Sequence, residues 1–196
     1  MKAFIFLYPI SRYIDNEIKN NAYGQKGGEE VFRQKCQKLL NQCIDLRYRQ
    51  NGWPICYALF NDCVISDLIR LHPADKIIKV GLDFKTHTAQ RPDKIFPYPD
   101  EDFILDQMGP VDTVRVAGFH IWDCAEKLAK RAYERGLKTL IDEDLTEFFF
   151  WRIKSQDFAL DHFPSFNPKN MNPRLFAEFM AARKIRPWLW QEYQHY

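Results

Sequence analysis

The sequence lacks several features that would indicate a function class directly. No run approaches the roughly 20 apolar residues of a membrane span, and the opening MKAFIFLYPISRYIDNEI has no signal-peptide cleavage pattern. The charges nearly balance, with 28 basic and 26 acidic residues and a net charge of +2, so there is no electrostatic basis for binding nucleic acid. We therefore expect a cytoplasmic protein that binds neither membranes nor nucleic acid.

Signals for a metal ion or a cofactor are also missing. The five cysteines are odd in number, lie in core-like segments and form no C-x-x-C pair of the kind that binds zinc. Reduced thiols are therefore expected. The glycine-bearing stretch YGQKGG is not a phosphate-binding loop, and no internal repeat is visible. The sequence thus predicts neither a metal site nor a cofactor.

The pattern that is present is an alternation of strands and helices. The continuous apolar run Ala3 to Tyr8 is typical of a central strand that is covered on both faces. Further strands are predicted at 53–61, 76–84, 111–117 and 137–142. Helices are predicted from about residue 29 to 46 and at 64–71, 103–108 and 122–135. A polar surface loop is expected over 15–30, and an irregular, exposed segment over 86–102.

This alternation predicts an α/β fold with three layers, in which helices cover both faces of a mostly parallel, Rossmann-like sheet. We assign residues 1–150 to this domain. Residues 151–196 form an aromatic-rich extension with three of the five tryptophans. So much aromatic surface is expected to pack on the domain or on a second subunit, through a helix after Pro173 and through Trp188 and Trp190.

One cysteine lies where a helix begins after a strand. In VDTVRVAGFHIWDCAEKLAKRAYERG, residues 111–136, a strand leads through Gly118 to Cys124. Ligands of open parallel sheets bind where strands end and helices begin, and a helix N-terminus favours a thiolate over a thiol whose pKa is ordinarily about 8.5. Cys124 also shares a helix face with Leu128 and Ala132, which is typical of a buried structural thiol. Both interpretations stay open.

The stretch from Val111 to Thr146 resembles the isochorismatase-like cysteine hydrolase superfamily, which includes nicotinamidases and N-carbamoylsarcosine amidohydrolases. Members resemble this stretch in having a strand, a glycine, five residues and then the nucleophilic cysteine, here Gly118 and Cys124. The resemblance places the catalytic lysine at Lys94, 30 residues upstream, where a solvated lysine is the alternative. It implies hydrolysis of a small amide or related carbonyl compound, and a homodimer or larger assembly.

The resemblance fails at the end of the first strand. Family members carry there an aspartate that serves as the general base, whereas this chain has Tyr8, and a phenol with a pKa of about 10 is a poor base at neutral pH. The Asp-x-His pattern with which nicotinamidases hold a metal is also missing between Cys36 and Arg70. Two functions therefore stay open: a cysteine hydrolase of weak or altered activity, or a catalytically inactive relative that binds a small ligand or forms an oligomeric interaction module.

Several other side chains are candidates for the substrate pocket. They are Tyr8, Asp62, Phe119 and His120. Asp62 can instead cap a following helix, and His120 can be an ordinary hydrogen-bonded loop residue. Asp123 is more typical of a helix cap than of a base for its neighbour. Of the acidic run 142–144, one carboxylate is expected to point into the cleft, and the other two to be solvated or to cap a turn.

Overall fold

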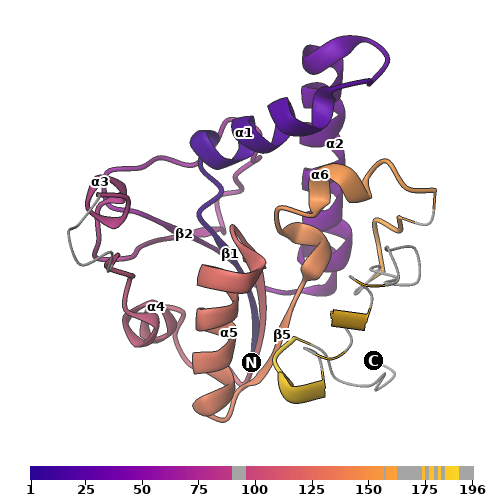
Figure 1. The fold of residues 1–196 in the computed structure, drawn as a ribbon. Coiled ribbons are helices and arrows are strands. Elements are labelled where there is room, and N and C mark those ends of the chain that lie inside the picture. Colours follow the sequence, from indigo (N-terminus) through magenta and orange to yellow (C-terminus); the bar gives the residue numbers. More distant parts are fainter. Residues whose placement is uncertain are drawn as a thin grey trace.

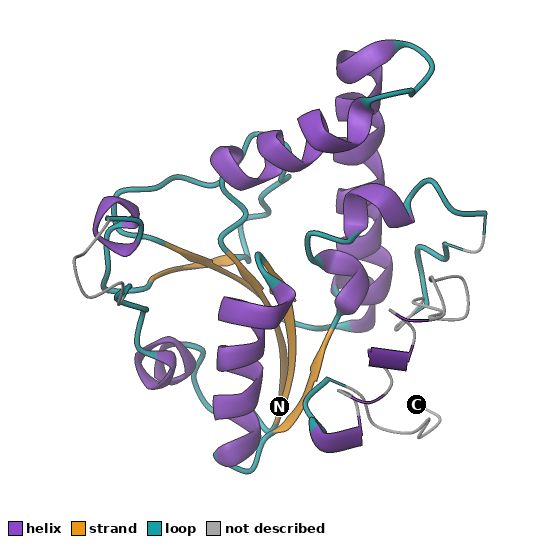
Figure 2. Cartoon of the chain, in the orientation of Figure 1, coloured by secondary structure: helices purple, strands orange, loops and turns teal. Residues whose placement is uncertain are grey.

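A computed structural model describes residues 1–89, 96–156, 158–162, 174, 177–178, 181 and 184–189 of the 196-residue chain. A sheet occupies the middle of the molecule, and helices pack on both of its faces (Figures 1 and 2). The strands are β1 (Lys2–Leu7), β2 (Ile55–Leu59), β3 (Lys76–Lys79), β4 (Thr113–Gly118) and β5 (Lys138–Ile141). Their order across the sheet is β3-β2-β1-β4-β5, and every neighbouring pair is parallel. The predicted α/β fold with a parallel sheet is confirmed.

The described helices connect these strands and close the ends of the domain. They are α1 (Ser11–Ala22), α2 (Gly28–Arg47), α3 (Phe84–His87), α4 (Glu101–Gln107), α5 (Glu126–Glu134) and α6 (Phe149–Arg152). Short turns of other helical types lie at Arg49–Asn51, Ile121–Ala125 and Glu143–Leu145. Within the described residues, none of the helices has both the length and the apolar character needed to cross a bilayer.

The alternation of side chains along β1 divides the core into two halves. Ala3, Ile5 and Leu7 face a cluster that includes apolar residues of α4 and α5. Phe4 and Phe6 face the other cluster, built on α1, α2 and α6. Because successive strand residues point to opposite faces, a strand that is apolar at every position needs helices on both sides. The three-layer arrangement therefore follows from the run AFIFL.

Two local predictions are wrong. The expected loop over 15–30 contains most of α1, which buries Ile14, Ile18 and Ala22 on one stripe. The expected helix over 64–71 is instead an irregular segment with a turn at residues 67–68. There the Ser66 backbone N–H donates to the Pro9 carbonyl at 2.8 Å. The side chain of Asn41, on α2, donates to the Leu68 carbonyl and accepts the backbone N–H of Arg70. These contacts satisfy the backbone without a helix.

The end of the described chain returns to the domain. Leu189 is buried in the α4/α5 half of the core, and the backbone N–H of Ile141 in the edge strand donates to the Trp188 carbonyl at 3.1 Å. The Trp188 indole also donates to Glu126 of α5 at 3.2 Å. Trp190 lies outside the described residues, as do Phe176 and Phe179 in the segment predicted to form a helix after Pro173.

Candidate functional site

The strand order places one site at the middle of the sheet. The chain adds β2 and β3 on one side of β1 and then crosses to the other side to form β4. At such a reversal the connections leave in opposite directions, and a crevice forms beyond the carboxyl ends of the two strands. Tyr8 directly follows β1, and the turn that carries Cys124 follows β4. The topology therefore brings these two residues, far apart in sequence, to one place.

Gly118 allows the two central strands to approach at this end. It pairs with Leu7, and a Cβ atom built on Gly118 would lie 2.3 Å from the Leu7 carbonyl oxygen. Its φ of +129° also lies in a region that favours glycine. A larger residue would push β4 away from β1 just before the site.

The chain then turns into the helix that bears the thiol. The Phe119–His120 peptide bond is cis, and residues Ile121–Ala125 form a π-helical turn that continues into α5. Cys124 lies on the face of this turn that meets the sheet and is 8% exposed. It therefore lies at the inner wall of the crevice rather than on the surface.

A narrow pocket opens beside the Cys124 sulfur. Its lining comes from β1, the segment before α4, α4 itself and the start of α5: Leu7, Tyr8, Tyr98, Pro99, Glu101, Ile104, Cys124 and Leu128. The space open to the centre of a water molecule is about 10 Å³, which is about what one water molecule needs. The Tyr98 hydroxyl donates to Asp123 at 3.1 Å and so ties the rim of the pocket to the Cys124 turn.

The surroundings of Cys124 favour the protonated thiol. Burial, and then the neighbouring Asp123 carboxylate, raise the pKa of Cys124 to about 12. Lys127 opposes this shift in part; its ammonium donates to Asp123 at 2.6 Å. Of the two interpretations that the sequence left open, this raised pKa is typical of the buried structural thiol.

A carboxylate already occupies that helix terminus. Glu147 accepts the backbone N–H of Ile121, with its two oxygens at 2.9 and 3.2 Å from the nitrogen. Its negative charge meets the positive end of the helix and takes up one of the free N–H donors. Burial raises the pKa of Glu147.

Two phenols lie near the sulfur and stay protonated. Burial raises the pKa of Tyr8 well above its usual value and that of Tyr13, on α1, to about 12, and the charge that Cys124 carries as a thiolate acts in the same direction on both. Tyr8 is 2% exposed and stacks on Phe60 with ring centres 4.3 Å apart. Tyr8 has a φ of +54°, which is uncommon for a residue other than glycine. Phenols of this kind are hydrogen-bond donors rather than bases.

The other residues predicted for the site, where the structure describes them, lie outside the lining of the Cys124 pocket. His120 is 46% exposed in its side chain, lies edge-on to the Tyr13 ring, and has Nδ1 3.8 Å from a Glu147 oxygen. Phe119 is buried in the other half of the core, where it packs on Phe6, and does not line the pocket. Lys94 lies outside the described residues.

Asp62 caps a helix other than the one expected. Its carboxylate accepts the backbone N–H groups of Phe84 at 2.6 Å and Lys85 at 3.3 Å, at the start of α3. The hydrogen bond from the Phe84 N–H lowers the pKa of Asp62. Asp62 does not line the Cys124 pocket. Nowhere in the described part of the chain do three or more His, Cys, Asp or Glu side chains gather in a way that would hold a metal ion.

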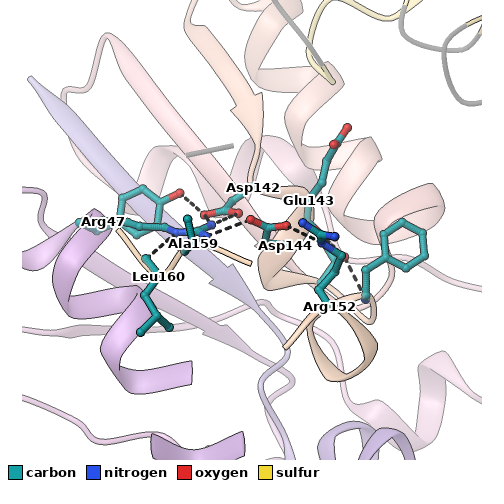
Figure 3. Close-up of polar contacts among 10 residues, drawn as sticks. Arg47, Asp142, Glu143, Asp144, Arg152, Ala159 and Leu160 are labelled. Carbon is teal, nitrogen blue, oxygen red and sulfur yellow. Dashed lines mark hydrogen bonds and ion pairs between the residues drawn. The ribbon is translucent and has the colours of Figure 1, made fainter. Parts of the chain in front are cut away.

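The acidic run after β5 is buried, contrary to the expectation that two of its members would be solvated or cap a turn. Asp142, Glu143 and Asp144 are each at most 1% exposed. Arg47 of α2 donates to both Asp142 oxygens at 2.9 and 3.1 Å and to Asp144 at 2.9 Å, and Arg152 of α6 approaches Asp144 within 3.6 Å (Figure 3). The two aspartates therefore form an internal ion network and do not belong to the Cys124 pocket.

Three residues near Cys124 were missed from the sequence. Glu101 and Tyr98 line its pocket, and Tyr13 interacts electrostatically with it. Tyr13 lies between the predicted first strand and the predicted loop over 15–30, and the other two lie in the proline-rich segment 86–102. No periodic pattern there indicates which side chain faces inward.

Comparisons with known proteins give a likeness of fold. No family model and no curated protein sequence matches this chain. Among solved structures, N-carbamoylsarcosine amidase from Thermoplasma acidophilum is 16% identical, with a TM-score of 0.45 over 74% of this chain and 83% of that one. MAR1 ribonuclease from Caenorhabditis elegans is 12% identical, with a TM-score of 0.43 over 77% and 70%. The YcaC gene product of Escherichia coli, described as an octameric hydrolase of unknown specificity, is 12% identical, with a TM-score of 0.41 over 94% of both chains.

The first of these structures is of the amidase class named by the sequence resemblance. At these identities and TM-scores we transfer no residue role from any of them.

Proposed function

We propose that this protein is a hydrolase that uses Cys124 as the nucleophile on a small amide, ester or related carbonyl compound. The observation that carries the proposal is the meeting of the Cys124 thiol and the Tyr8 phenol in one pocket at the reversal point of the sheet. A thiol supplies the attacking atom, and a protonated phenol supplies a donor for the oxygen on which negative charge develops.

The reaction would proceed through a covalent thioester. The Cys124 sulfur attacks the carbonyl carbon while its proton passes to an acceptor in the pocket, and the C=O π pair moves to the oxygen. Tyr8 stabilises that oxyanion, with Tyr13 as a second donor. Collapse expels the amine or alcohol, which takes up the proton. Water then attacks the thioester, and the products are a carboxylic acid and the free thiol.

The pocket chemistry limits the substrate class. Among the described lining residues the one charged side chain is the carboxylate of Glu101, and the others are apolar or phenolic. Such a lining favours a neutral or cationic compound over a carboxylate or phosphate. We also propose that Lys94, which the sequence resemblance names, gives electrostatic support to the oxyanion.

The test is a panel of short amides and esters without a negative charge. The wild-type protein is expected to hydrolyse at least one of them, and Cys124→Ala to lose that activity. Cys63→Ala is the matched control, because Cys63 is a free, partly exposed thiol outside the lining of the pocket. Activity that survives in Cys124→Ala would contradict the proposal.

A second function is favoured by the pKa of about 12 at Cys124 and by the small volume of its pocket. In that case the thiol is structural, and the chain is a catalytically inactive relative that binds a small ligand. It predicts that a compound of the panel raises the melting temperature of the wild type and of Cys124→Ala equally, and that neither variant turns it over.

A further inference from the structure

Four acidic residues lie along α4 and at its N-cap, and three of them have clear structural partners. Asp100 accepts the backbone N–H groups of Asp102 and Phe103 and so caps the helix. Asp102 pairs with Arg131 at 2.7 Å and with Arg135, and Asp106 pairs with Arg135 at 2.8 Å. These contacts fasten α4 to α5 and leave the fourth acid, Glu101, to be explained.

Glu101 faces the thiol pocket instead of the α5 arginines. It is half-buried and lines the pocket together with Cys124 and Tyr8. No other group in the described part of the chain forms a hydrogen bond or an ion pair with its carboxylate. Its negative charge raises the pKa of both Cys124 and Tyr8, as expected for a carboxylate close to both groups. Half-burying a charge without a partner costs stability, so its position calls for another explanation.

We propose that Glu101 is the proton acceptor for the Cys124 thiol. This inference rests on the hydrolase function proposed above and supplies the base that the phenol of Tyr8 cannot provide. It assigns the base to the first turn of α4 rather than to the end of the first strand. Three of the four acids hold α4 in place, and the fourth, Glu101, lines the same pocket as Cys124.

In each step the Glu101 carboxylate accepts one proton and then returns it. As the S–C bond forms, the thiol proton moves to a Glu101 oxygen, and the acid so formed then protonates the leaving amine or alcohol. In the second half Glu101 takes a proton from the attacking water and returns it to the sulfur as the thioester C–S bond breaks. No oxidant, metal or cofactor is needed.

Removing this charge should change two properties of Cys124 in opposite directions. Glu101→Gln removes the base, so acyl transfer to the sulfur is expected to slow by about 100-fold or more, the range typical of general-base catalysis. The same substitution removes a negative charge near the thiol, so more thiolate forms at a given pH, and direct alkylation is expected to speed up a few-fold. A purely structural role for Glu101 does not give this combination.

The experiment uses p-nitrophenyl acetate to measure the burst of p-nitrophenolate, and iodoacetamide at mildly alkaline pH to measure alkylation mapped to Cys124. Glu134→Gln is the matched control, since Glu134 lies on the exposed end of α5 beside Arg131. Cys124→Ala identifies the part of the burst that belongs to this sulfur. Circular dichroism checks that Glu101→Gln keeps the fold, which a near-isosteric change should do.

The outcomes separate the two proposals. A slower burst with faster alkylation in Glu101→Gln alone supports the inference. An unchanged Cys124-dependent burst in Glu101→Gln overturns the role of Glu101 and leaves the hydrolase proposal standing. Unchanged alkylation in Glu101→Gln shows that Glu101 does not act on the sulfur, and this result also overturns the role of Glu101. A wild-type protein with no Cys124-dependent burst overturns the hydrolase proposal and the role of Glu101 with it.

Discussion

Replacing Arg47 by leucine tests whether the internal ion network holds the domain together. The Arg47 side chain is fully buried and makes contacts with two carboxylates, described above, as well as with two carbonyl groups. Its Nε donates to the Leu160 carbonyl at 2.9 Å, and its Nη2 to the Ala159 carbonyl at 2.6 Å. It therefore joins α2, the end of β5 and the segment after α6.

The size of the effect follows from what the substitution leaves behind. Asp142 keeps the hydrogen bond from the Tyr48 hydroxyl at 2.6 Å, and Asp144 keeps the approach of Arg152. Neither contact replaces the lost positive charge on Arg47. Removing one partner of a buried ion pair typically costs about 3–5 kcal/mol, a large part of the roughly 5–15 kcal/mol by which domains are stable.

Urea unfolding followed by circular dichroism measures the loss. Arg131→Leu is the control, because Arg131 also pairs with a carboxylate, that of Asp102, but both side chains are more than 40% exposed, and such pairs contribute about 0–1 kcal/mol. The double variant Arg47→Leu, Asp142→Asn removes one uncompensated charge and should recover part of the loss. If Arg47→Leu costs no more than Arg131→Leu, the network does not stabilise the fold as described.

Three further results are expected. Gly118→Ala should lower the free energy of unfolding by well over 1 kcal/mol, because the new Cβ meets the β1 backbone at a φ that favours glycine. Gly24→Ala is the control and should cost less, since the space around Gly24 is open. Equal losses of the two variants in urea unfolding would contradict this. Among the five cysteines, Cys63 should react first with iodoacetamide in the native protein, since the other four are buried; peptide mapping that finds Cys124 first would show an activated thiol. In an absorbance titration of the nine tyrosines, those with raised pKa values should ionise late: Tyr8, Tyr13, Tyr48 and Tyr57. Folding raises the pKa of Tyr13, so the stability associated with this residue is present below its unfolded-state pKa and is lost as the pH rises. The free energy of unfolding should therefore fall between pH 10 and about pH 12. If all nine tyrosines titrate together near pH 10 in the folded protein, this prediction is wrong.

The fold could be predicted where hydrophobic periodicity decides the structure. The apolar run of β1 indicated a strand covered on both faces, and the glycine and helix after β4 placed Cys124 just beyond the carboxyl end of a strand. The helix α1 was missed because three apolar residues at a spacing of four, Ile14, Ile18 and Ala22, lie in an otherwise polar stretch. That spacing is a helical signal, and the surrounding asparagines and glycines obscured it.

The rest depended on contacts between distant parts of the chain. Asp142 and Asp144 read as surface acids until Arg47, 95 residues before Asp142, is placed beside them. Glu101 is one acid among four in DEDFILD, and only the structure shows that Asp100 caps α4, that Asp102 and Asp106 pair with α5, and that Glu101 lines the pocket. The pKa of Cys124 depends on burial and on local charges, which a helix start in the sequence does not reveal.

The central claim is that the Cys124 sulfur attacks a carbonyl carbon in this pocket. The most direct measurement is to treat the protein with p-nitrophenyl acetate, quench it in acid during the burst and locate the acetyl group by peptide mass spectrometry. The account predicts that the acetyl group is found on Cys124 and that its level falls sharply in Glu101→Gln. Hydrolysis of the thioester then returns Cys124 to the free thiol once the substrate has been consumed. Acetyl on Cys63 or on surface lysines, with Cys124 unmodified, would contradict it.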